Sequence, residues 1–138
     1  IDTFHGRARL TGRNSLEVGE ETLEFSNLLI AAGAEPRKLG IPGEEHLVTN
    51  EGFLELGDMP KRIVLVGGGY IAAEFSHIAA RAGAEVVILQ RGERLLPQFD
   101  PDVVGWLMES FRQLGVDVRL ETTVQAVEQT RAGFRVHA

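Results

Sequence analysis

The sequence predicts an α/β fold in which a parallel sheet with crossover helices follows a small antiparallel β-meander. Residues 63–66 and 86–89 are short runs of apolar residues only, typical of parallel strands covered on both faces. An amphipathic stretch of helical length follows each run, as a crossover between neighbouring parallel strands requires. Short stretches within residues 4–25 instead alternate between apolar and polar side chains, which is typical of half-buried antiparallel strands.

The composition is that of an ordinary globular domain. The chain has 138 residues, of which 43% are hydrophobic and 25% charged, and it contains no cysteine. Without cysteine, these residues form no disulfide, no thiolate-bound cluster and no thiol-based active site of their own. The net charge of −6, with 20 acidic residues against 14 Lys and Arg, disfavours a nucleic-acid partner.

The sequence offers neither a membrane segment nor a metal site. The longest apolar stretch, residues 63–75, includes three glycines and Glu74, whereas about 20 apolar residues span a bilayer. No signal-peptide pattern opens the chain, so we expect a cytoplasmic protein without membrane association. The four histidines lack the spacing of ligands, and we expect no bound metal.

Beyond the meander, the first 40 residues predict one further strand. Residues 28–32 are apolar throughout and end at Gly33, so we expect a parallel strand there. Residues 33–60 contain recurrent Gly and Pro and predict a connection, with a short helix near 51–56.

We therefore expect a first unit at 1–40, a connection at 41–60 and a second unit at 61–138. The chain begins with Ile, and its last five residues form a strand pattern without a terminator. These ends predict a piece of a longer protein, with the second unit truncated at its C-terminal end.

Both helices of the second unit carry apolar residues at helical spacing. The first spans residues 70–82 and is predicted to bury Ile71, Phe75, Ile78 and Ala82. The second begins at Asp100-Pro101, an N-cap followed by Pro at the first helical position, and ends at Gly115. Its buried residues are predicted to be Val103, Leu107, Phe111 and Leu114. Strands at 116–120, at 124–127 and around Phe134 complete the order β-α-β-α-β-β.

The pattern Gly67-x-Gly69-x-x-Ala72 lies between the first parallel strand and the first helix. Gly67 permits a sharp turn, Gly69 lets a pyrophosphate approach the backbone, and Ala72 lets the helix press on the sheet. The free N–H groups at the start of the helix would then face the phosphates. The pattern predicts a Rossmann-like dinucleotide-binding domain; the alternative is a structural turn that binds nothing.

The end of the second parallel strand indicates which dinucleotide is preferred. NAD sites usually place Asp or Glu there to accept a hydrogen bond from the ribose 2′-hydroxyl. This chain has Gln90, then Arg91, with Arg94 nearby, and arginine pairs with a 2′-phosphate. We expect NADP(H) to be preferred over NAD(H), unless both arginines are merely solvated loop charges.

These residues carry a resemblance to a known family. Residues 67–75, Gly-Gly-Gly-Tyr-Ile-Ala-Ala-Glu-Phe, resemble the pyridine-nucleotide motif of the FAD-dependent pyridine nucleotide-disulfide oxidoreductases, especially the glutathione reductase branch. Phe99-Asp100-Pro101 and Glu121-Thr122-x-Val124 resemble downstream positions of the family. Upstream, residues 30–36 resemble the segment that closes the first part of the FAD domain, and Ile41-Pro42-Gly43 also fits. The resemblance covers essentially the whole chain.

The resemblance implies a role for each matching position. Tyr70 would cover the flavin until nicotinamide displaces it, and Glu74 would meet the nicotinamide carboxamide. Without the resemblance, both would be read as exposed helix residues. The full set implied for NAD(P)H is Gly67, Gly68, Gly69, Tyr70, Ile71, Ala72, Glu74, Gln90, Arg91, Arg94 and Val124, with Val124 beside the adenine. The set implied for FAD, through backbone groups, is Arg7, Ala8, Ala32 and Gly33.

Three positions bear on how closely the chain follows the family. Ala32 replaces the usual Thr, which removes a hydroxyl. The second phosphate-binding arginine of the family would fall at Pro97, so Arg94 would have to take its place. Ala72 occupies a position where NAD-using relatives often carry Gly, which favours NADP(H).

The resemblance also implies the reaction of the intact protein, which is hydride transfer from NADPH to FAD and then to a disulfide. The redox Cys pair, the catalytic His and the dimerisation domain of the family would lie outside this chain, so we expect these residues to bind nucleotide but to be inactive alone. The intact protein would be a homodimer. A mercuric, dihydrolipoamide or mycothiol-type reductase, or a nucleotide-binding domain without catalysis, would also fit the sequence.

Overall fold

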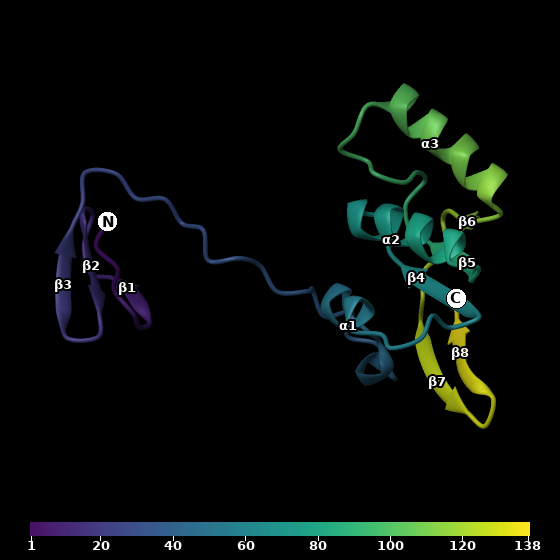
Figure 1. Cartoon of the computed structure of the whole chain (residues 1–138), viewed down its shortest axis with the longest axis horizontal. Helices are drawn as coiled ribbons and strands as arrows, with labels where there is room; N and C mark the ends of the chain where they lie inside the picture. Colours follow the sequence, from purple (N-terminus) through teal and green to yellow (C-terminus); the bar gives the residue numbers. More distant parts are fainter. The chain divides into compact units, whose positions relative to one another are not determined.

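The computed structural model describes residues 1–138 and divides the chain into two compact units, Ile1–Glu35 and Pro36–Ala138. The first unit is an antiparallel sheet of three short strands in the order β1-β2-β3, drawn in purple in Figure 1. The strands are β1 (Ala8–Leu10), β2 (Ser15–Val18) and β3 (Glu21–Glu24). Gly19, with a φ of 64°, makes the tight turn between β2 and β3. The predicted meander is confirmed.

The strand expected at residues 28–32 does not form, and this prediction was wrong. The segment has no regular secondary structure, and the side chains of Leu29 and Ile30 are 88% and 75% exposed. An apolar strand of this kind must pair its backbone with neighbouring strands and be covered on both faces. None of the three sheets extends to residues 28–32, so nothing supports the extended conformation as a strand.

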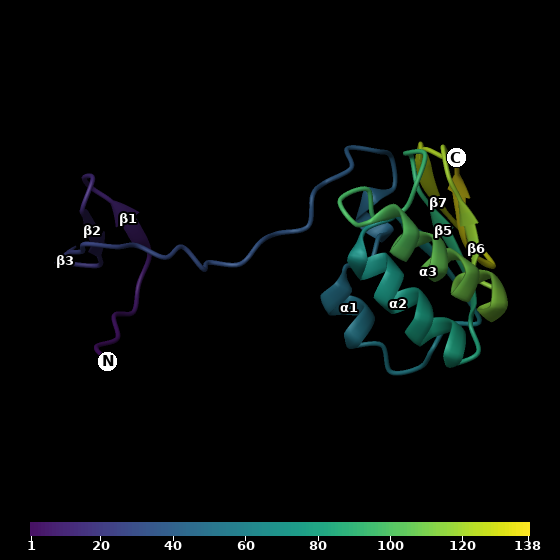
Figure 2. The ribbon, with the colours of Figure 1, turned by 90° about the horizontal axis from the view of Figure 1, so that it is seen from above.

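The second unit contains the parallel sheet predicted from the apolar runs. Its strands are β4 (Arg62–Val66), β5 (Glu85–Leu89) and β6 (Asp117–Arg119), in the order β4-β5-β6. Helices α2 (Tyr70–Arg81) and α3 (Pro101–Leu114) make the two crossovers. Figure 2 shows both helices on one face of the sheet. The α/β fold with a parallel sheet is confirmed.

A hairpin covers part of the other face of the sheet. It consists of β7 (Ala126–Thr130) and β8 (Gly133–His137), paired antiparallel. Val136 of the hairpin packs with the buried Val87 and Leu89 of β5. The short helices η1 (Glu44–His46) and α1 (Asn50–Leu54) precede the sheet in the chain. None of the helices is both long enough and apolar enough to cross a bilayer.

The face that α2 turns to the sheet differs from the predicted one. Its buried residues are small: Ala72, Ala73, Ser76 and Ala79. Ile71 and Ile78 are 38% and 49% exposed, and Ala82 is exposed as well. Small side chains let the helix axis lie close to the strands, whereas a branched side chain there would force the two layers apart. Phe75 is half-buried and stacks on Phe53 of α1, with ring centroids 4.4 Å apart.

Helix α3 follows the sequence prediction more closely. The Oδ1 atom of Asp100 accepts hydrogen bonds from the backbone N–H of Asp102 and of Val103, at 2.9 and 3.3 Å, as an N-cap should. Phe111 is fully buried and Val104 is nearly so. Val103, expected to be buried, is instead 52% exposed, because its neighbour Val104 occupies the buried face of the helix.

Candidate dinucleotide-binding site

The three glycines between β4 and α2 have three different environments. Gly67 has a φ of +99°, a conformation that disfavours any side chain, and its N–H donates to the Leu89 carbonyl at 2.8 Å. A Cβ on Gly68 would clash with the Leu95 side chain and lie 3.1 Å from Gln90 Cδ. A Cβ on Gly69 would meet no atom within 4 Å, and the φ of −85° is open to any residue. A side chain at position 69 would therefore begin in space that only its two chain neighbours border within 4 Å.

No side chain caps the N-terminus of α2 beside this space. Gly69 is its N-cap residue and supplies no side-chain hydrogen bond, and the first turn contains no acidic residue. The first backbone N–H groups of a helix lack partners inside the helix and attract anions. Helix α3 differs, because Asp100 caps it and Asp102 lies in its first turn. Of these two helices, only α2 presents free donors next to an open space.

Gln90 follows β5 and connects the glycine turn to the next loop. Its Oε1 accepts the N–H of Gly68 at 3.0 Å, and its Nε2 donates to the carbonyl of Arg94 at 3.1 Å. The Nη2 of Arg94 donates to the carbonyls of Pro97 and Phe99, at 2.5 and 2.9 Å. Residues 90 and 94 are therefore part of one hydrogen-bonded network with the glycine turn.

Arg91 has a different environment. Its side chain is exposed and makes neither an ion pair nor a hydrogen bond within the chain. It follows directly after Gln90, at the carboxyl end of the parallel sheet, where open α/β sheets bind their ligands. A guanidinium in this position is available to an anion.

The other predicted nucleotide contacts lie on both sides of the sheet. On α2, Tyr70 is 60% exposed, Glu74 is exposed, and Ala72 is 8% exposed. Val124 is 8% exposed and packs with Val87 and Leu89 on the opposite face from the helices. The structure thus links Gly68, Gln90 and Arg94 by hydrogen bonds, with Tyr70 at the start of the adjoining helix.

The residues implied for FAD lie in the first unit. Arg7 and Ala8 are exposed at the start of β1, and Ala32 and Gly33 are exposed in the segment without secondary structure. Gly33 has a φ of +78° and open space at its Cβ position.

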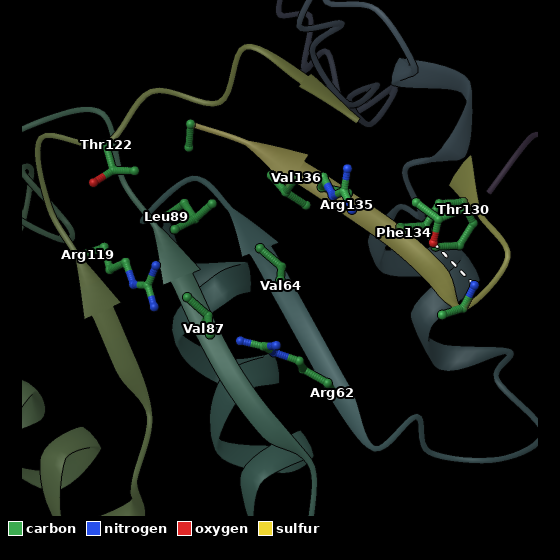
Figure 3. A pocket seen from close by; sticks show the side chains of 12 residues that line it. Arg62, Val64, Val87, Leu89, Arg119, Thr122, Thr130, Phe134, Arg135 and Val136 are labelled. Atoms are coloured by element: carbon green, nitrogen blue, oxygen red, sulfur yellow. Dashed lines mark hydrogen bonds between the residues drawn. The ribbon is translucent and has the colours of Figure 1, made fainter. Parts of the chain in front are cut away.

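A cavity that no sequence pattern indicated lies between the sheet and the hairpin (Figure 3). It measures about 600 Å³ and is lined by apolar side chains, including Val64 and Val87, and by three arginines. Each arginine lies within 4 Å of an acid: Arg62 of Glu85, Arg119 of Asp117 and Arg135 of Glu128. No residue of the glycine turn lines this cavity. No group of three or more His, Asp or Glu residues forms a metal site.

Comparison with known proteins covers the whole chain. Residues 1–138 match the family model described as pyridine nucleotide-disulphide oxidoreductase. A glutathione reductase from Nostoc sp. is 32% identical over 136 residues, which are 99% of this chain and 30% of that protein. A mercuric reductase from Staphylococcus aureus is 35% identical over 131 residues, 94% of this chain and 24% of that protein.

A solved structure agrees with the fold. The HOCl-induced flavoprotein disulfide reductase RclA from Escherichia coli has a TM-score of 0.77 and 29% sequence identity, and the match covers 100% of this chain and 33% of that one. The chain therefore spans a third or less of the length of the relatives it matches. The resemblance found in the motifs is confirmed: the chain belongs to the pyridine nucleotide-disulphide oxidoreductase family.

Proposed function

We propose that this chain is the pyridine-nucleotide-binding part of an FAD-dependent disulfide reductase and that it prefers NADP(H). The observation that carries the proposal is the geometry at Gly69. Neither its backbone conformation nor a neighbouring atom requires glycine there, yet it borders the uncapped start of α2. A pyrophosphate that approaches the backbone at this point would explain the glycine at position 69 and would accept hydrogen bonds from the free N–H groups of α2.

The nucleotide preference rests on the end of β5. No carboxylate stands at position 90, and both polar ends of the Gln90 side chain already bind backbone groups. Arg91, which is exposed and unpaired, is free to form a charge-assisted contact with a 2′-phosphate. Arg94 would support this contact by shaping the loop, and its remaining N–H groups would still be available to the phosphate.

The resemblance supplies the remaining contacts of the proposal. Tyr70, exposed at the first position of α2, would cover the flavin until the nicotinamide enters. Glu74, one turn further along the same helix, would accept a hydrogen bond from the carboxamide. Val124 would lie next to the adenine. Backbone groups of Arg7, Ala8, Ala32 and Gly33 would contact the FAD.

In the intact protein, bound NADPH and FAD would supply the redox chemistry, passing a hydride and then its electrons to a disulfide. This chain contributes binding and orientation. It contains no cysteine, so thiols from elsewhere would have to take part in the last step. We expect the 138 residues alone to bind nucleotide without catalysing turnover, and the intact protein to be a homodimer.

The substrate of the intact protein could also be that of a mercuric reductase, since one relative at 35% identity carries that name. Dihydrolipoamide and a mycothiol-type disulfide are two further candidate substrates, and nucleotide binding without catalysis is a further candidate function. The nucleotide contacts proposed above would be the same in each case, so they do not distinguish these substrates.

Isothermal titration of the folded chain with NADPH and NADH tests the proposal. We expect heat from both, with NADPH binding about tenfold more tightly, which corresponds to about 1.4 kcal/mol. Circular dichroism on the same sample checks that the protein is folded. Absence of heat with both nucleotides in a folded sample would overturn the proposal.

A further inference from the structure

Gln90 joins two segments that lie apart in the sequence, the glycine turn before α2 and the loop at residues 91–99. It is half-buried, and its backbone and side chain each make two hydrogen bonds. The backbone N–H donates to Arg119 and the backbone carbonyl accepts from Thr122, both at 2.9 Å, which fixes the residue to the edge of β6. The side chain is thereby held in place to bind both segments.

A second contact reinforces this link between the glycine turn and the loop at residues 91–99, which we call the joint. The N–H of Leu96 donates to the Gly68 carbonyl at 2.8 Å, and Leu96 adopts a φ of +46° to do so. Leucine rarely adopts this left-handed conformation, so the surrounding packing has to maintain the conformation. Leu95, only 2% exposed, fills the space that a side chain at position 68 would need. Gly68 is thus held on its N–H side by Gln90 and on its carbonyl side by the loop.

The loop is also closed on itself. Arg94 donates from its guanidinium to Pro97 and Phe99, while its own carbonyl accepts from Gln90. Residues 94–99 therefore form a closed loop, which is attached to the rest of the unit by the Gln90 amide, by the Leu96–Gly68 hydrogen bond and by the buried side chains of Leu95 and Leu96. Arg91 lies between Gln90 and this closed loop, and the adjacent Gly92 is also held, because its carbonyl accepts from the N–H of Glu121 at 3.0 Å.

We propose that Gln90 is a positioning residue that fixes the distance between the glycine turn and Arg91. The inference rests on the proposed function, in which the turn holds the pyrophosphate and Arg91 reads the 2′-phosphate. Only a side chain that both accepts and donates a hydrogen bond at this length fits the site. Glu would accept from Gly68 but could not donate to Arg94, and Met would do neither.

Amide hydrogen exchange in the nucleotide-free chain tests the joint itself. In Gln90→Met we expect Gly68 and Leu96 to exchange about tenfold faster, while Val87 and Ile88 in the core of β5 keep their rates. In Gln90→Glu we expect Gly68 to stay protected and only Leu96 to exchange faster. Gln98→Met is the matched control, because Gln98 lies exposed in the same loop without a side-chain hydrogen bond.

Nucleotide titration tests the positioning role. Gln90→Met should lower the affinity for NADPH more than that for NADH, since only NADPH has a phosphate for Arg91 to read. A purely structural role would weaken both nucleotides equally. In an Arg91→Met background, Gln90→Met should no longer change the ratio of the two affinities.

Each outcome decides a separate point. Unchanged exchange at Gly68 in Gln90→Met overturns the joint, and an equal loss for both nucleotides overturns the positioning role. If Gln90→Met does not fold, Gln90→Glu decides through Leu96, whose unchanged rate would overturn the joint. If the parent chain binds neither nucleotide, the proposed function and the positioning role both fail, and the exchange data still decide the joint.

Discussion

Gly43 lies against Val127 so closely that a Cβ on the glycine would overlap the valine carbonyl. The N–H of Val127 donates to the carbonyl of Pro42 at 2.9 Å, so the segment before η1 is hydrogen-bonded to β7. Residues near 41–43, expected from the sequence to be a connection, are therefore packed into the second unit. The tight approach explains why glycine, with a φ of +79°, stands at this position.

The first prediction concerns this contact. Gly43→Ala should lower the free energy of unfolding by about 3 kcal/mol or more, because it adds a steric clash to the cost of a left-handed alanine. Gly40→Ala is the matched control, since Gly40 has a φ of +68° but open space at its Cβ. It should cost only about 1 kcal/mol. Urea unfolding measures both, and equal losses would refute the steric explanation.

The second prediction concerns the packing of α2. Ala79 is fully buried against the sheet, whereas Ile78 is 49% exposed. Ala79→Leu should destabilise the protein by about 1–3 kcal/mol through overpacking, and Ile78→Ala should cost less than about 1 kcal/mol. Thermal unfolding followed by circular dichroism compares the two. A larger loss of stability in Ile78→Ala than in Ala79→Leu would instead support the buried helix face predicted from the apolar periodicity.

The third prediction concerns the proposed contact between Arg91 and the 2′-phosphate. Arg91→Glu should remove the proposed preference for NADPH and leave NADH affinity within about threefold, because only the phosphate would meet the new negative charge. Arg131→Glu makes the same charge change at an exposed arginine in the β7–β8 turn, and it should leave both affinities unchanged. Titration calorimetry provides both affinities. An unaltered preference in Arg91→Glu would show that Arg91 does not read the phosphate.

The sequence predicted those parts of the fold that depend on local patterns. The apolar runs at β4 and β5, the Asp100 cap and the Gly115 stop are each set by neighbouring residues, and all appear in the structure. The predicted face of α2 was wrong because hydropathy marks Ile78 as a better core residue than Ala79. The distance between helix and sheet, which favours the smaller side chain, is a tertiary property.

Partners remote in sequence explain the remaining differences. The strand expected at residues 28–32 needs neighbouring strands, and a sequence pattern cannot report whether they are present. Gln90 was singled out by its place after β5, but its bonds to Gly68 and Arg94 depend on a fold that brings three segments together. The cavity beside the hairpin likewise arises from β7 and β8 lying over the sheet.

The most direct test of nucleotide binding at the glycine turn is the NADPH affinity of Gly69→Ala. The variant should lose less than about 1 kcal/mol of stability, because the backbone conformation accepts alanine and its Cβ meets open space. Asp100→Ala, a change at the N-cap of α3 with a similar cost, is the matched control. We predict that NADPH binds Gly69→Ala at least about tenfold more weakly than the parent chain and Asp100→Ala. Equal NADPH affinity in all three would contradict a pyrophosphate site at Gly69.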